Sequence, residues 1–351
     1  MDNRLLDVSG LCVDFSTDQG TVHAVRDVSF HVDRGEVLGI VGESGSGKSI
    51  SVLSCMGLIA ANGTIKQGSI RFDGRELSPA GLRTRRERRQ HEEMLGRIRG
   101  SEIGMIFQDP MTFLNPVLTV GTQLTEGIRA HMKCSAAEAR EKAIGLLTQV
   151  GIPSPERRLK QYPYEFSGGM RQRIIIAIAL ACDPKLIIAD EPTTALDVTV
   201  QAQILELIRE RAEANGTSVV MITHDLGVVA SLCSRIMILY GGKVAEEGTA
   251  DEIFYQAKHP YTQGLLGSIA RRGEGGREPL TSIPGTPPDL IHINSGCPFM
   301  TRCGSAMKIC KDYLPCETRF SETHTASCWL YCKEKARELV AAQDAKRGER
   351  A

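Results

Sequence analysis

The feature that most constrains this chain is a glycine-rich loop near its N-terminal end, called the phosphate loop below. Its residues, in order, are Gly42, Glu43, Ser44, Gly45, Ser46, Gly47, Lys48 and Ser49. They match the pattern G-x-x-x-x-G-K-S/T without a mismatch, between an apolar run at 36–41 and a helix-like stretch at 48–59. Glycines let backbone N–H groups converge on a phosphate, and the following helix directs its positive end toward it. The loop predicts a nucleotide site in which Lys48 reaches the β- and γ-phosphates and the Ser49 hydroxyl coordinates Mg²⁺.

A second nucleotide-binding element is predicted at residues 186–191. An apolar run there ends in two carboxylates, Asp190 and Glu191. Such an ending is by itself a common boundary between strand and loop, and its meaning comes from the phosphate loop that accompanies it. Asp190 is expected to hold Mg²⁺, directly or through water, and Glu191 to orient and polarise the attacking water.

The first 245 residues have an α/β pattern. Runs typical of strands lie at 22–32, 36–41, 185–189, 218–223 and 235–239. Segments of helical length separate most of them, which indicates a mostly parallel sheet covered on both faces. Between 111 and 165 the pattern contains helices without strands, so we expect a helical insertion.

Between the two nucleotide motifs, residues 166–173 open a long apolar helix and resemble the signature sequence of ATP-binding-cassette (ABC) ATPases. Other motifs of that family follow in order: Gln108 resembles its Q-loop, Asp197 its D-loop and His224 its switch histidine. Phe15 resembles the aromatic residue that stacks on adenine, although a core role suits it equally. The resemblance implies a P-loop NTPase cassette with a RecA-like core, an antiparallel β subdomain and a helical insertion.

The resemblance also implies residue roles. Two cassettes would sandwich two nucleotides, and the signature would contact the ATP held by the opposite subunit through Ser167, Gly168, Gly169 and Gln172. His224 would bridge the γ-phosphate and the opposing D-loop at Asp197, and Gln108 would ligate Mg²⁺. Because no catalytic residue of the motif set is altered, an active ATPase is expected.

Further segments resemble the ATPases of oligopeptide and dipeptide importers. They are the sequences around residues 41–49, 105–116 and 189–201, the His-Pro-Tyr marker in 258–262, and the cysteine-containing tail. This resemblance implies uptake of peptides, with nickel or glutathione as alternatives, by a complex at the cytoplasmic face of the inner membrane. The implied partners are a second, related ATPase in a heterodimer, two permease subunits and an extracytoplasmic substrate-binding protein.

Charge and hydropathy narrow the function classes. Lys plus Arg and Asp plus Glu both total 42, a balance that argues against a partner such as nucleic acid bound through global charge. The longest apolar stretches, such as 174–182, are core-sized, so a peripheral, cytosolic subunit is expected. A soluble ABC ATPase of translation or repair is the less favoured alternative, because those usually carry two cassettes or long insertions.

The cysteines concentrate at the C-terminal end. Of eleven, six lie in the tail, at 297, 303, 310, 316, 328 and 332. In a reducing compartment such a cluster favours a metal over a disulfide framework. By resemblance we expect an iron–sulfur cluster, [4Fe–4S], with zinc as the alternative, ligated by Cys297, Cys303, Cys310 and Cys328; Cys316 and Cys332 would be spare thiols. The predicted organisation is a cassette (1–245), a family extension and linker (246–288) and a cysteine-rich metal-binding segment (289–351).

Overall fold

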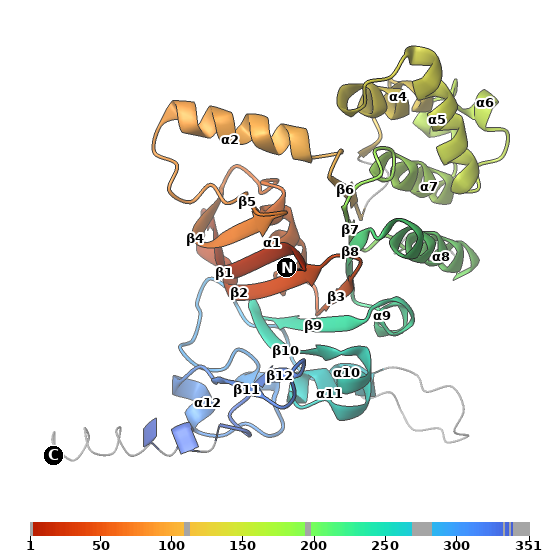
Figure 1. The fold of residues 1–351 in the computed structure, drawn as a ribbon. Helices are drawn as coiled ribbons and strands as arrows, with labels where there is room; N and C mark the ends of the chain where they lie inside the picture. The colour runs from red at the N-terminus through yellow and green to blue at the C-terminus, as the bar shows by residue number, and fades with distance from the viewer. Residues whose placement is uncertain are drawn as a thin grey trace, which may run out of the picture.

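The computed structural model describes residues 3–108, 113–193, 198–268, 283–332, 334–336 and 338–339. An eight-stranded sheet, ordered β11-β12-β10-β9-β3-β8-β7-β6, forms its centre, and a four-stranded sheet ordered β2-β1-β4-β5 lies beside it (Figure 1). None of the helices within the described ranges has the length and apolar character that a membrane crossing needs.

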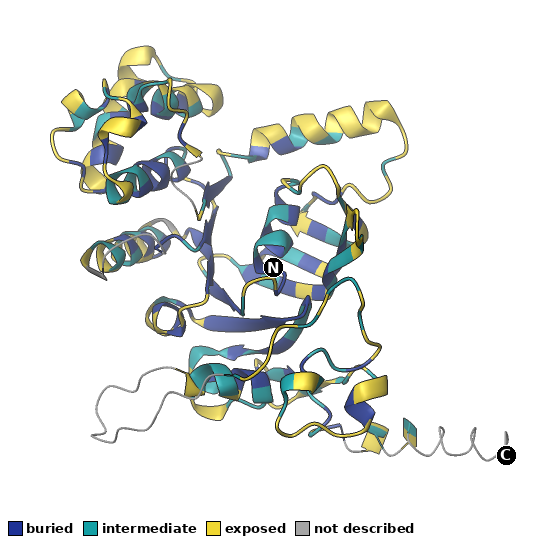
Figure 2. Ribbon diagram, turned by 180° about the vertical axis from the view of Figure 1, so that it is seen from behind, coloured by how far each residue is buried: buried dark blue, intermediate teal, exposed yellow. Residues whose placement is uncertain are grey.

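The parallel part of the large sheet positions the nucleotide motifs. Its strands are β9 (Arg235–Tyr240), β3 (Val37–Val41), β8 (Ser218–Thr223), β7 (Leu186–Asp190) and β6 (Ile103–Ile106). The helices flanking it are α1 (Lys48–Cys55), α8 (Val198–Asn215) and α9 (Leu226–Leu232). Because α1 lies on one face and α8 and α9 on the other, the strands are almost wholly buried, as Figure 2 shows. The expectation of a mostly parallel α/β core is confirmed.

The smaller sheet is antiparallel and lies on the same side as α1 (Figure 1). Its strands are β2 (Gly20–Asp33), β1 (Arg4–Thr17), β4 (Gly63–Phe72) and β5 (Arg75–Glu76). Inward side chains such as Leu6 and Val13 share one hydrophobic core with Ile40 of β3. The mixed-charge helix α2 (Arg85–Ile98) runs past this sheet and is exposed along most of its length, with Leu95 and Ile98 buried (Figure 2).

Helices without intervening strands follow β6. They are α4 (Val120–His131), α5 (Ala136–Gln149), α6 (Pro155–Arg158), the 3₁₀ turn η1 (Pro163–Glu165) and α7 (Gly168–Ala179). Side-chain caps fix several of their N-termini: Thr119 caps α4, and Ser135 forms a capping box with Glu138 at α5. Apolar faces of α4, α5 and α7 pack together in the second large core.

The chain after the predicted cassette continues the large sheet. Its elements are β10 (Lys243–Thr249), α10 (Ala250–Gln256), α11 (Pro260–Gly267), η2 (Met300–Arg302), α12 (Ile309–Asp312), β11 (Glu317–Arg319) and β12 (Thr325–Ser327). Strand β10 pairs with β9 on one side and with β12 on the other. We call residues 246–351 the C-terminal extension; of the linker predicted within it, residues 269–282 lie outside the described residues.

The extension is also held together differently from the expectation. Cys316 and Cys332, predicted to be spare thiols, form a disulfide. Trp329 and Phe299 of this segment are buried. Within the described ranges, no three His, Cys, Asp or Glu residues are grouped to hold a metal ion.

Candidate nucleotide site

The phosphate loop joins β3 to α1 and needs its glycines. Gly47, the residue before α1, has a φ of 98°, and a Cβ there would lie 2.6 Å from the Ala24 carbonyl oxygen. A Cβ on Gly42 would lie 2.2 Å from the Leu239 carbonyl oxygen. The loop therefore passes so close to neighbouring backbone that side chains are excluded at these two positions. Glycine at both positions permits the turn that phosphate binding needs.

Lys48 lies inside the loop rather than in solvent. Only 6% of its surface is exposed, and its Nζ donates to the carbonyl oxygens of Gly42 at 2.7 Å and Glu43 at 2.8 Å. Burial lowers the pKa of Lys48, while the carboxylates of Glu191, Asp190 and Glu43 oppose that shift. The ammonium is thus held within the field of all three acidic residues that surround the site.

Ser49 and Asp190 meet although they come from different motifs. The Ser49 hydroxyl donates to Asp190 Oδ1 at 3.0 Å. Asp190 is 7% exposed, and burial raises the pKa of its carboxyl against the opposing effect of the Ser49 hydrogen bond. Hydroxyl and carboxylate oxygens are the ligands that Mg²⁺ prefers. The pair therefore fits the predicted metal position, where a bound Mg²⁺ would neutralise charge on the nucleotide phosphates.

Glu191 contacts both of the other predicted catalytic residues, Gln108 and His224. Gln108 Nε2 donates to Glu191 Oε2 at 2.9 Å, and His224 Nδ1 donates to Oε1 at 3.2 Å. The backbone N–H of Glu191 donates to the Ile222 carbonyl oxygen at 2.9 Å, with φ at 45°. A carboxylate in left-handed backbone conformation, held by two neighbouring motifs, is the kind of local strain that collects at functional sites.

The signature residues lie at the N-terminus of α7, in the helical part of the molecule (Figure 1). The Ser167 hydroxyl caps this helix by accepting from the Met170 N–H at 3.4 Å. Ser167 and Gly168 are exposed and Gly169 is half-buried. These three residues are therefore accessible to a second chain.

Gln172, which the resemblance assigns to the signature, is buried within this chain. It is 2% exposed, and its Nε2 donates to the Pro192 carbonyl oxygen at 2.9 Å and to the Phe107 carbonyl oxygen at 3.5 Å. This side chain donates these hydrogen bonds to the backbone of its own chain. It ties α7 to the residues beside Gln108 and Glu191, a role that no sequence pattern indicated.

Two further predicted residues stay outside this constellation. Phe15 is half-buried against the core under the antiparallel sheet, which is consistent with its core alternative as well as with a stacking role. Asp197, predicted as the D-loop residue, lies outside the described residues.

The four cysteines predicted as cluster ligands lie near one another. The Cys297 N–H donates to the Cys310 carbonyl oxygen at 2.8 Å. Burial raises the pKa of the Cys297 thiol to about 12, and the negative charges of Cys310, Cys328 and Cys303 add to that shift. The thiols therefore lie within electrostatic range of one another without forming, among the described residues, a group that would hold a single ion.

Two residues of the C-terminal extension contact the phosphate loop, which the sequence did not predict. The Glu43 N–H donates to the Tyr261 hydroxyl at 2.9 Å, and both terminal nitrogens of Arg302 donate to the Glu43 carboxylate. These partners lie 218 and 259 positions away from Glu43 in the chain. Tyr261 belongs to the His-Pro-Tyr marker, but no sequence pattern indicated its contact.

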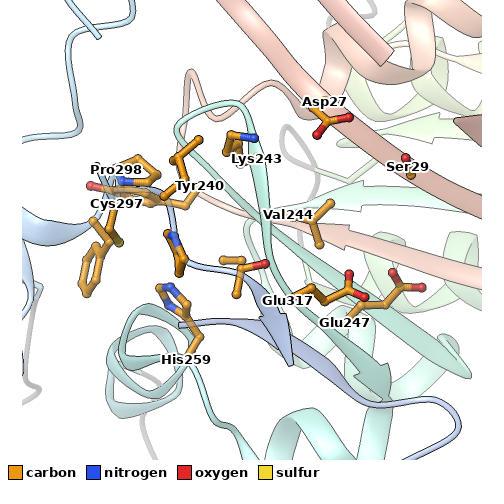
Figure 3. A pocket seen from close by; sticks show the side chains of 15 residues that line it. Asp27, Ser29, Tyr240, Lys243, Val244, Glu247, His259, Cys297, Pro298 and Glu317 are labelled. Atoms are coloured by element: carbon orange, nitrogen blue, oxygen red, sulfur yellow. The ribbon is translucent and has the colours of Figure 1, made fainter. Parts of the chain in front are cut away.

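A cavity of about 290 Å³ lies between the cassette and the extension. Tyr240, Cys297 and Pro298 line one end of it, and Glu247 and Glu317 lie farther along (Figure 3). No residue predicted to bind the nucleotide lines this cavity, so it is distinct from the phosphate loop.

Comparisons with known proteins agree with this geometry. The chain matches the family models "ABC transporter" over residues 25–194 and "Oligopeptide/dipeptide transporter, C-terminal region" over 245–310. It is 52% identical to the dipeptide transport ATP-binding protein DppD of Bacillus subtilis, over 98% of this chain and 99% of that protein. It is 50% identical to the oligopeptide transport ATP-binding protein OppD of Salmonella typhimurium, over 95% of both.

Among solved structures, it is similar to the dimeric ATP-binding cassette MJ0796 in a post-hydrolysis state bound to ADP and Pi. The TM-score is 0.61 at 28% identity, over 70% of this chain and 98% of that one.

Proposed function

This chain belongs to the ATP-binding subunits of oligopeptide and dipeptide ABC transporters, and from that premise we propose that it hydrolyses ATP to drive uptake of peptides across the cytoplasmic membrane. One observation carries the proposal: the phosphate loop and the strand end at Asp190 and Glu191 meet Gln108 and His224 in a chain that matches peptide-transport ATPases over nearly its whole length. Nickel and glutathione, the alternative substrates, have no such support.

Each residue of the site has a proposed role. Backbone N–H groups of the phosphate loop and Lys48 bind the phosphates, and Ser49 with Asp190 holds Mg²⁺. Glu191 orients and polarises the attacking water, with Gln108 and His224 fixing its carboxylate by the two hydrogen bonds described above.

We propose that the chain acts as one of two cassettes, paired with a related ATPase. Ser167 and Gly168 are exposed at the start of α7, where they would contact ATP on the partner cassette. Two permease subunits would receive the helical segment at 111–165 at the cytoplasmic face of the membrane, and an extracytoplasmic binding protein would deliver substrate. Full transport with this chain as the only ATPase would contradict the heterodimer and leave the ATPase role intact.

An uptake assay with the reconstituted complex tests which substrate is transported. Proteoliposomes containing both ATPases and the permeases, supplied with the binding protein, should accumulate labelled di- and oligopeptides only when ATP and Mg²⁺ are present on the ATPase side. Labelled Ni²⁺ and glutathione serve as competing substrates in the same assay. If the complex accumulated Ni²⁺ or glutathione without any peptide present, that compound would be the substrate instead of peptides.

We also propose that the C-terminal extension holds a [4Fe–4S] cluster through Cys297, Cys303, Cys310 and Cys328. The mutual electrostatic effect of these thiols supports the choice of ligands, and four thiolates suit such a cluster. Zinc is the alternative, because thiolate ligands suit Zn²⁺ as well.

Metal analysis of anaerobically purified protein tests this proposal. Brown protein with visible charge-transfer absorption and bound iron is expected, and C303S should lose most of the iron. C134S, which changes a half-buried cysteine outside the extension, is the matched control and should keep it. Colourless protein with stoichiometric zinc, or C303S with full iron content, would overturn the proposal.

A further inference from the structure

Every polar group of Glu43 in the phosphate loop is engaged by another residue. Its carboxylate accepts from both terminal nitrogens of Arg302, at 2.6 and 3.0 Å. Its N–H donates to the Tyr261 hydroxyl at 2.9 Å, and its carbonyl oxygen accepts from Lys48 at 2.8 Å. Two of these three partners, Arg302 and Tyr261, come from the C-terminal extension, so this extension fixes the first half of the loop.

Arg302 is itself held rigidly. Its side chain is 5% exposed, and its Nε donates to the Pro284 carbonyl oxygen at 2.9 Å. One terminal nitrogen also donates to the Tyr240 hydroxyl at 3.1 Å, and the other to the Ile283 carbonyl oxygen at 3.2 Å. The bidentate contact with Glu43 raises the pKa of Arg302 above the already high value of arginine, so the guanidinium is always charged.

The surroundings of this ion pair are closely packed. The rings of Tyr240, Tyr261 and Phe299 are in mutual contact, with centroids 4.4 to 5.4 Å apart. A Cβ on Gly241 would lie 2.9 Å from Pro298 of the extension. A cavity of only about 10 Å³ remains between the phosphate loop and the extension, room for no more than one water.

The carboxylate of Glu43 has the wrong charge for a loop that binds phosphate. The loop uses backbone N–H groups and a lysine to attract the negative triphosphate, and an uncompensated Glu43 would repel it. Arg302 supplies the compensating charge and also fixes the direction of the carboxylate by bidentate geometry. Arg302 belongs to the C-terminal extension, 259 positions from Glu43 in the chain. A cassette without the extension would therefore lack this compensating charge.

We propose that Arg302 is a positioning residue for ATP binding, which neutralises and anchors Glu43 so that the phosphate loop keeps its full attraction for the triphosphate. The C-terminal extension thereby acts on the nucleotide affinity of the cassette. The inference rests on the proposed function in one respect, that this loop binds ATP·Mg²⁺.

Equilibrium binding of ATP·Mg²⁺ to the full chain tests the proposal. R302M should weaken binding about tenfold, because one uncompensated charge then faces the phosphates. R302K, which keeps the charge without the fork, should lose about threefold. The defect of R302M should shrink as salt rises, since screening weakens repulsion between charges. In the assembled transporter, R302M should raise KM for ATP while kcat changes less than about twofold.

A second substitution in the loop separates this role from a merely structural one. E43Q alone should lose less affinity than R302M, and E43Q combined with R302M should restore most of the affinity that R302M loses, because the repelling charge is gone. R319M, which alters an exposed arginine of the same extension, is the matched control and should bind as the wild type does.

Wild-type affinity in R302M, or a double variant no better than R302M, would overturn the proposal. A wild-type chain that binds no ATP would instead contradict the proposed function. Circular dichroism of each variant identifies loss of folding. If R302M unfolds, R302K keeps the test decisive, because wild-type affinity in R302K would overturn the anchoring role of Arg302.

Discussion

Among single residues, Glu191 has the most contacts with the other predicted catalytic groups. Its carboxylate is oriented from two sides, by Gln108 after β6 and by His224 after β8, while its own strand β7 lies between those two. The resemblance of their motifs to the ABC family predicted that these residues share one site, although strand β6 before Gln108 was not among the predicted runs. The hydrogen bonds between them could not be predicted, because they depend on side-chain directions.

The substitution E191Q tests the assignment of Glu191. Glutamine keeps the shape and can still bond Gln108 or His224, but it polarises water poorly, so ATP hydrolysis by the assembled transporter should fall roughly 100-fold or more. Affinity for ATP·Mg²⁺ should stay close to that of the wild type. K48A is the contrasting variant, expected to weaken nucleotide binding itself. Hydrolysis by E191Q at the wild-type rate would mean that another group activates the water.

At the element scale, helix α11 shows why the His-Pro-Tyr marker has that order. His259 caps the helix, its Nδ1 accepting from the Tyr261 N–H at 3.0 Å; Pro260 occupies the first helical position, where no N–H is needed. Tyr261 then directs its hydroxyl to the phosphate loop. Burial lowers the pKa of His259 to about 4, so the ring is neutral in the folded protein at neutral pH.

This cap predicts a pH-dependent stability. In the unfolded chain His259 binds a proton below about pH 6.5, whereas in the folded protein it does so only near pH 4, so unfolding takes up a proton between these values. The free energy of unfolding should therefore fall as pH drops through this window, with His259 contributing roughly 3 kcal/mol of the loss.

The variant H259N isolates that contribution, because asparagine caps helices well and does not titrate near these pH values. Urea unfolding across the window should show a shallower loss of stability for H259N than for the wild type. Parallel pH profiles for the two proteins would show that His259 is not buried in its neutral form.

Elements were predictable from sequence where periodicity was strong. The runs at 218–223 and 235–239 correspond to β8 (Ser218–Thr223) and to most of β9 (Arg235–Tyr240). Strands β11 and β12 were not predicted, because each has only three residues, too few for an alternating pattern. Their place in the sheet also depends on contacts with residues far away in the sequence. One such contact joins His324 to Glu246, 78 positions earlier.

At the scale of the whole molecule, the cassette and its extension share structure instead of being linked as separate units. Strand β10 extends the parallel sheet through β9 and receives β12 on its other side. Glu246 at this junction is wholly buried and accepts from the Lys258 N–H at 2.6 Å, the His259 N–H at 2.9 Å and His324 Nε2 at 2.7 Å. A single carboxylate thus joins the sheet, the start of α11 and the extension.

The substitution E246Q tests whether this junction makes one cooperative unit. Glutamine places an NH₂ group where the carboxylate accepted hydrogen bonds, which leaves buried donors facing one another and should cost roughly 3 kcal/mol. If cassette and extension unfold together, calorimetry should show the main transition shifting to lower temperature in E246Q. E317Q, at an exposed glutamate on β11, is the matched control and should leave it unchanged. The contrary result would be an unchanged main transition in E246Q together with a separate minor transition at lower temperature. The extension would then fold on its own, and its contacts with the phosphate loop would not contribute to the stability of the cassette.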